Sequence, residues 1–152
     1  MMFTSSLASR ANPQTDRSIG RIVSVTGAKA IVLLDDNRQN KDVTFSRPEM
    51  GTLLGIETDT TIALGLVSAL SVPVPAQRDG DPEVWIAELG LVGEITKDKS
   101  GAPKDFNRGV SSYPALGDRV RVASREELIK AFSAPENAAV KVGTIRQDST
   151  IP

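Results

Sequence analysis

Carboxylate and serine side chains can catalyse reactions or bind metal ions, and two adjacent pairs of them are the first candidates for such chemistry. The pairs are Asp35 with Asp36 and Ser111 with Ser112. Paired carboxylates act as metal ligands or as a general acid and base, and a serine acts as a nucleophile beside a histidine. The sequence has no histidine or cysteine, and no third carboxylate adjoins Asp35 and Asp36. We therefore interpret the aspartates as turn residues and the serines as loop residues.

Five charged residues offer a different chemistry, which is the binding of a partner. Arg108, Arg119 and Arg121 form either a contact surface for DNA, a protein partner or a neighbouring subunit, or a solvated strand face. Glu88 and Glu94 form either an ion-pairing face across a subunit boundary or an ordinary outward face. Exposed ion pairs contribute only about 0–1 kcal/mol each, so pattern alone leaves both alternatives open.

The single tryptophan and the single tyrosine, Trp85 and Tyr113, are candidates for stacking on nucleic-acid bases. Such a platform needs several aromatic residues interleaved with basic ones, and aromatic residues make up only 4% of this chain. We interpret Trp85 as a core residue and keep Tyr113 as a candidate interface residue in a loop. Arg146 is a plain surface residue unless the family resemblance described below holds, which would place it within reach of a bound nucleotide.

The segment from residue 108 to residue 122 must position several of these side chains. Its first half contains Gly109, Pro114 and Gly117, which interrupt any periodic pattern and predict a loop. Its second half alternates Arg119 and Arg121 with two valines, which predicts a strand with the arginines on one face. A loop that enters an alternating strand through a Gly-Asp pair is typical of the corner of a small barrel.

The rest of the sequence reads as short strands separated by turn residues. The strands are predicted at residues 19–25, 28–34, 52–56, 61–70, 83–95 and 138–145, with a short edge piece at 43–45. In the fourth of these, Ala63, Gly65, Val67 and Ala69 form a small-residue face suited to a crowded barrel interior. In the fifth, Trp85, Ala87, Leu89, Leu91 and Ile95 are predicted to point inward, with Glu88 and Glu94 outward.

Three further segments complete the prediction. Residues 72–82 are proline-rich and predict an exposed loop, and residues 97–107 predict a mobile charged insertion. Ser124 followed by Glu127 is a capping box that begins a short helix, with Leu128 and Phe132 on one face. The expected fold is therefore all-β: a small closed or partly open barrel of six to seven strands, with one short helix near the C-terminus.

Composition limits the classes of function. The 152 residues carry a net charge of −1, which argues against a strong overall attraction to nucleic acid or to an anionic membrane. No apolar run is long enough for a transmembrane helix, and residues 1–18 lack the apolar centre of a signal peptide. We expect a flexible tail over residues 1–18, a barrel over 19–146, a second tail over 147–152, and a cytoplasmic protein without membrane partners.

The order of these features resembles the N-terminal barrel of the HerA-type hexameric ATPases, which is shared in outline with the ATP synthase subunits. The matching stretches are residues 19–23 (Ile-Gly-Arg-Ile-Val), 51–55 (Gly-Thr-Leu-Leu-Gly) with 64–67 (Leu-Gly-Leu-Val), 106–118 (Phe-Asn-Arg-Gly-Val-Ser-Ser-Tyr-Pro-Ala-Leu-Gly-Asp) and 142–148 (Val-Gly-Thr-Ile-Arg-Gln-Asp). The third stretch is the most specific of them, and the resemblance covers nearly everything after residue 18.

The resemblance implies an oligomerisation and partner-docking barrel that helps hold a hexameric DNA translocase together. It implies a nuclease or Sir2-like effector as partner, and DNA contact only through the full-length ring. In that family the last stretch leads into a phosphate-binding loop, but this sequence contains no Gly-x-x-x-x-Gly-Lys-Ser/Thr motif. We therefore expect a barrel lacking its ATPase domain, which is not an enzyme, needs no cofactor or metal, and does not hydrolyse ATP. The alternative is a free-standing oligonucleotide-binding barrel.

Overall fold

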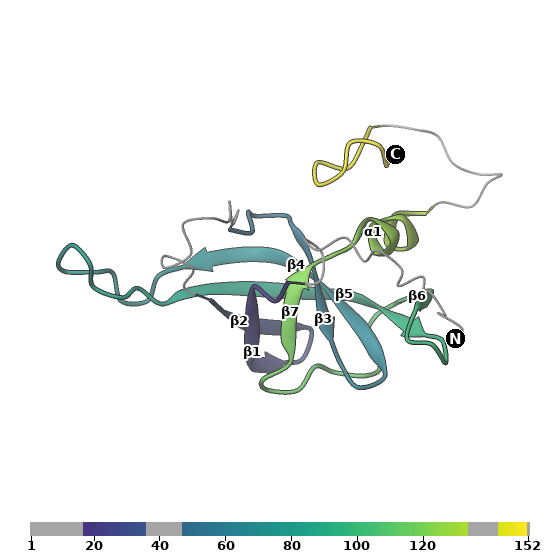
Figure 1. The fold of residues 1–152 in the computed structure, drawn as a ribbon, viewed down its shortest axis with the longest axis horizontal. Helices are drawn as coiled ribbons and strands as arrows, with labels where there is room; N and C mark the ends of the chain where they lie inside the picture. The colour runs from purple at the N-terminus through teal and green to yellow at the C-terminus, as the bar shows by residue number, and fades with distance from the viewer. Residues whose placement is uncertain (1–16, 36–46, 134–142, 152) are drawn as a thin grey trace, which may run out of the picture.

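A computed structural model describes residues 17–35, 47–133 and 143–151 of the chain (Figure 1). The elements in chain order are β1 (Gly20–Thr26), β2 (Lys29–Leu34), β3 (Leu53–Glu57), β4 (Thr61–Ser71), β5 (Trp85–Lys97), β6 (Pro103–Arg108), β7 (Arg119–Val122) and α1 (Arg125–Phe132). Six of the strands pair in the order β1-β7-β3-β4-β5-β2, and β2 pairs with β1 to close the circle. The predicted all-β barrel with one short helix is confirmed, and it is a closed barrel.

The seventh strand, β6, lies outside this circle and pairs with the C-terminal half of β5. Every strand pair in the described part of the chain is antiparallel. Four of these pairs join strands that are consecutive in the chain, as in hairpins. The hairpin of β4 and β5 is the longest, and its connecting loop projects away from the barrel (Figure 1). The predicted proline-rich loop lies at this tip and is largely exposed.

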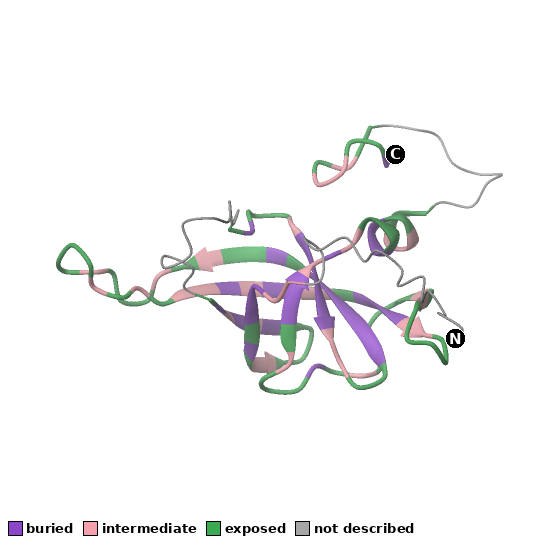
Figure 2. Cartoon of the chain, in the orientation of Figure 1, coloured by how far each residue is buried: buried purple, intermediate pink, exposed green. Residues whose placement is uncertain are grey.

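The barrel interior is filled by alternating aliphatic side chains, and Figure 2 shows the buried residues along the barrel strands. Ala30, Val32 and Leu34 of β2 are buried there, in step with the two-residue period of a strand. Each fully buried aliphatic side chain of this kind contributes roughly 1.5–3 kcal/mol to the free energy of unfolding. Part of the predicted small-residue face of β4 also lies inside the barrel. Leu89 packs against Gly65 there, and a Cβ added to Gly65 would lie 3.0 Å from the Leu89 side chain.

The inward alternation of β4 holds only as far as Val67. A register irregularity between Val67 and Ala69 reverses the two sides of the strand, so Leu70 packs against the core and Ala69 is exposed. The prediction that Ala69 belongs to the interior face is therefore wrong. A period-two pattern cannot show such a bulge, because the extra residue leaves no signal in the sequence.

A second bulge, in β5, changes the place of one candidate interface residue. Leu64 pairs with Gly93 while Gly65 pairs with Leu91, so Val92 has no partner on β4. The alternation reverses at this residue, and Glu94 pairs with Ala63, whose side chain belongs to the interior core. The prediction that Glu94 points outward is wrong, since only 5% of this residue is exposed.

The segment from 97 to 107, predicted as a mobile insertion, forms regular structure instead. β5 continues to Lys97, and β6 returns alongside it after a turn held by Asp98, which accepts hydrogen bonds from Ser100 and Ala102. The sequence did not predict β6 because, apart from its proline, Phe106 is the one apolar residue among its six residues. The Phe106 ring packs closely against Gly93. A Cβ added to Gly93 would lie 2.4 Å from the nearest carbon of that ring.

A second apolar cluster lies on the outer surface of the barrel, between the strands and α1. Its buried members are Leu53, Ile62, Leu64, Ile95, Ala123, Leu128 and Ile151. Ile95 was predicted to point into the barrel, but its pairing with Ile62 places it in this outer cluster. The predicted capping box is confirmed, because Ser124 and Glu127 exchange side chain to backbone hydrogen bonds at the start of α1.

The C-terminal segment packs against this outer cluster. Gln147 accepts a hydrogen bond from the Leu53 amide at 2.7 Å and donates one to the Leu53 carbonyl at 3.0 Å, and Ile151 is buried. The predicted final strand at 138–145 is not formed over residues 143–145, and its remainder lies outside the described residues, as does the edge piece at 43–45. No helix among the described residues is long and apolar enough to cross a membrane.

Candidate functional site

The six candidate interface residues fall into two groups. Arg108, Tyr113 and Arg119 are exposed and Glu88 is partly exposed, whereas Glu94 and Arg121 are buried. Glu88 pairs with Lys29 on the neighbouring strand β2 at 2.6 Å. Because this pair is solvent-exposed, its contribution to stability is small.

The loop over residues 109–118, here called the closing loop, runs from β6 to β7 along one end of the barrel (Figure 1). Backbone hydrogen bonds fix its far end: the Ile22 amide donates to Asp118 at 3.0 Å, and the Gly117 amide donates to Ile22 at 2.8 Å. The Asp118 carboxylate also accepts a hydrogen bond from the Ala115 amide at 2.8 Å. The predicted loop and strand of this segment are therefore both confirmed.

Glu94 holds the near end of the closing loop. Its carboxylate accepts hydrogen bonds from the amides of Ser111 and Ser112, each at 3.1 Å, and a short one from the Ser111 hydroxyl. Burial opposes ionisation of Glu94, but these hydrogen bonds outweigh it and hold the pKa of the carboxyl below its usual value. The serines are therefore structural donors to a buried carboxylate, which agrees with their interpretation as loop residues.

Two large apolar side chains project from the closing loop into solvent. Tyr113 is 57% exposed and Leu116 is 71% exposed. Loops that are held in one conformation bind partners at a lower entropic cost, and tyrosine is enriched among residues that dominate binding energy. The arrangement of Glu94, the loop and these two side chains is suited to protein recognition.

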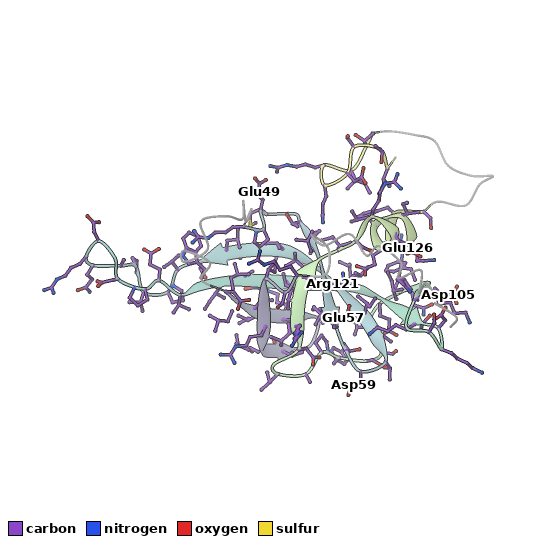
Figure 3. All side chains as sticks on the ribbon, in the orientation of Figure 1. Glu49, Glu57, Asp59, Asp105, Arg121 and Glu126 are labelled. Carbon is purple, nitrogen blue, oxygen red and sulfur yellow. The ribbon has the colours of Figure 1, made fainter. Side chains whose placement is uncertain are left out.

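An ionic network joins the outer face of the barrel to α1, and Figure 3 labels two of its members, Arg121 and Glu57. Arg121 of β7 donates to Glu127 of α1 at 2.6 and 3.0 Å, and to Glu57 of β3 at 2.7 and 3.1 Å. Lys97 of β5 completes the network with a 2.8 Å contact to Glu57. Glu127 is only 2% exposed, so its charge depends on Arg121 for compensation.

The network shifts the pKa values of Glu57 and Arg121. Burial alone would raise the pKa of Glu57, but hydrogen bonds and charge interactions with Lys97 and Arg121 outweigh it and lower that pKa. Burial likewise opposes the charge of Arg121, whereas Glu127 and Glu57 raise its pKa. The expectation of a solvated or partner-binding Arg121 fails because α1 covers this side of β7, although its position on the arginine face of the strand was predicted correctly.

The remaining chemical candidates have structural partners. The guanidinium carbon of Arg47 lies 3.7 Å from the centre of the half-buried Trp85 ring, and Trp85 packs against the barrel core. Arg146 pairs with Glu49. Across residues 17–35, 47–133 and 143–151, no group of three His, Cys, Asp or Glu side chains is arranged to hold a metal ion. Asp36 lies outside these ranges.

Comparison with known proteins identifies no family. No protein-family model matches this chain, and no curated protein matches it.

Proposed function

We propose that this chain is a protein–protein interaction barrel that assembles with copies of itself and docks a partner protein. The observation that carries the proposal is the closing loop, in which Glu94 fixes the backbone while Tyr113 and Leu116 remain exposed. A buried carboxylate that fixes the conformation of a surface loop is expected where recognition depends on that conformation.

The more specific form of the proposal is the barrel of a HerA-like hexameric DNA translocase, which recruits a nuclease or Sir2-like effector. Its support is the sequence resemblance, whose most specific stretch includes the closing loop. A closed antiparallel barrel followed by a short helix is compatible with that role. The barrel supplies contacts in this proposal, and the ATPase chemistry belongs to a separate motor domain.

Native mass spectrometry of the chain across a concentration series tests this function. We expect oligomers, including hexamers, whose population rises with concentration. The double variant Tyr113→Ser with Leu116→Ser is expected to shift the population toward monomer, because it removes exposed apolar contact area without touching the core. Val74→Ser, which alters another exposed apolar residue on the distant β4–β5 loop, is the matched control and is expected to change nothing. A monomer at every concentration would overturn assembly by this barrel.

A further inference from the structure

An apolar groove lies on the outer surface of the barrel between β6 and the C-terminal end of α1. Its volume is about 270 Å³, and Leu66, Val92, Phe106 and Phe132 line it. It is continuous with a more polar hollow of about 440 Å³, since both share Phe106, Arg108 and Ala131. We call the two together the β6–α1 groove.

The floor of the β6–α1 groove keeps large apolar side chains in contact with solvent. The bulge in β5 turns Val92 outward, where 40% of it is exposed, and Leu66 and Phe132 are exposed to a similar degree. These residues come from three separate elements and meet at one place. Clustered exposure of this kind marks an interaction surface, whereas scattered exposed apolar residues are ordinary.

The rim of the β6–α1 groove is basic. Lys104 and Arg108 come from β6, and Lys130 comes from α1. In the part of the chain that the structure describes, none of these three forms an ion pair, and Asp105 is the one acidic residue lining the groove. Their positive charge is therefore available to an acidic partner.

The spacing along β6 specifies the partner more closely. Phe106 and Arg108 are two residues apart and share one face of the strand. Lys104 lies beyond a register irregularity between Phe106 and Pro103 but lines the same hollow, so a cation lies on each side of the aromatic ring. Within the described residues β6 pairs with β5 alone, which leaves its other edge without a strand. An added strand would place its own residues opposite Phe106 and Arg108, with Lys104 further along the same edge.

We propose that the β6–α1 groove binds an extended segment of a partner protein with the pattern acidic-x-apolar-x-acidic. The segment pairs with the edge of β6, its apolar side chain enters the groove over Phe106, and its two carboxylates meet Lys104 and Arg108. This proposal rests on the interaction role proposed above, but it assigns the partner to a different surface from the closing loop.

Fluorescence anisotropy with a labelled peptide containing Glu-Thr-Phe-Thr-Glu tests the proposal on the full chain. We expect saturable binding that weakens as salt is raised. Peptides containing Lys-Thr-Phe-Thr-Lys or Glu-Thr-Ser-Thr-Glu are expected to bind at least about tenfold more weakly, because each lacks one half of the pattern. A peptide with proline in place of both threonines loses backbone donors and is also expected to bind weakly.

Matched variants locate the binding site. Arg108→Glu is expected to weaken peptide binding about tenfold or more, whereas Arg78→Glu on the β4–β5 loop makes the same charge change and leaves binding unaltered. Val92→Ser is expected to weaken binding severalfold. Val23→Ser is its control, because Val23 is also a bulged strand residue that is 40% exposed. Circular dichroism and thermal melting of each variant verify the fold.

Three results would overturn the inference: no preference for the acidic-x-apolar-x-acidic peptide, equal effects in the site and control variants, or loss of self-association in Arg108→Glu and Val92→Ser. The last result would assign the groove to a second copy of this chain. The Tyr113→Ser with Leu116→Ser variant separates the two proposals, since it is expected to retain peptide binding. A chain that remains monomeric and still binds the peptide would refute self-assembly and support the groove.

Discussion

At the scale of single residues, Glu94 joins β5 to the closing loop through three hydrogen bonds. Glu94→Gln keeps the shape of the side chain but replaces one acceptor oxygen with an amide donor. At least one of the Ser111 and Ser112 donors then faces another donor, so we expect the free energy of unfolding to fall by about 1–3 kcal/mol. Urea denaturation measures this loss, and an unchanged midpoint would show that Glu94 does not hold the loop.

The lowered pKa of Glu94 gives its contribution a defined pH dependence. A carboxyl with a lower pKa in the folded state stabilises the fold fully above its ordinary pKa of 4.5, and the contribution is lost as pH falls through the lower, folded value. Glu57 follows the same sign. We therefore expect Glu94→Gln to flatten the decline of stability below pH 4.5, as measured by denaturation at a series of pH values. A parallel decline in the variant and the parent protein would contradict this.

Arg119 and Arg121 offer a comparison between two arginines on the same strand face. Arg121→Met leaves the buried Glu127 carboxylate without its cation, so we expect a loss of about 3–5 kcal/mol in the free energy of unfolding. Arg119→Met removes an exposed charge and is expected to change stability by no more than about 0.5 kcal/mol. Chemical denaturation of both variants makes the test. Equal effects would show that the ionic network does not matter for stability.

The sequence could place these side chains on strands but could not state which were buried. The alternation of Arg119 and Arg121 with valines predicts their shared face correctly. Burial of Arg121 depends on where α1 packs, which no local pattern reports. Glu94 was misplaced for a different reason, because the bulge at Val92 reverses the strand face without any distinguishing residue type.

At the scale of elements, the β5–β6 hairpin depends on a close contact that only glycine permits. A Cβ on Gly93 would lie 2.4 Å from the Phe106 ring and 2.5 Å from the Asn107 carbonyl oxygen, so Gly93→Ala must displace β6. We expect a loss of about 1–3 kcal/mol, typical of overpacking. Gly90→Ala on the same strand meets no atom within 4 Å and is the control. Thermal melts that shift equally for both variants would exclude this contact as a determinant.

Prediction of the elements succeeded where apolar residues alternate and failed where they do not. β2 and β4 were predicted within one or two residues of their ends because their buried residues set the pattern. The capping box located α1 because Ser124 and Glu127 satisfy each other locally. β6 depends instead on its pairing with β5 and on one aromatic contact with Gly93, and both are tertiary.

At the scale of the whole molecule, several of the barrel's charges are paired within the chain. The 18 basic and 19 acidic residues nearly cancel, and Arg121, Lys97 and Lys29 are engaged with carboxylates inside the chain. A contact between subunits of a ring could use the opposite charges of four residues, which are Glu88, Glu94, Arg119 and Arg121. In the described part of the chain, three of these already have partners and only Arg119 does not. We therefore expect any self-association to resist added salt, as apolar contacts do.

The same charge arrangement bears on the alternative of an oligonucleotide-binding barrel. Among the described residues, Lys104, Arg108 and Lys130 gather at one place, the β6–α1 groove. Three phosphate contacts give a slope of about −3 for the logarithm of the duplex association constant against the logarithm of salt concentration. We expect a slope no steeper than this and weak binding, measured by anisotropy of a labelled duplex over a salt series.

Arg108→Ala sharpens this DNA test, because loss of one phosphate contact is expected to make the slope shallower by about one while weakening all sequences alike. Arg78→Ala on the distant loop is the matched control and is expected to leave the slope unchanged. Tight binding with a steep slope, insensitive to Arg108, would show a nucleic-acid surface elsewhere on the barrel and would favour the oligonucleotide-binding alternative. Weak DNA binding with a shallow salt slope would favour protein partners as the ligands of the β6–α1 groove. An apolar floor between cations suits an acidic polypeptide better than a phosphate backbone.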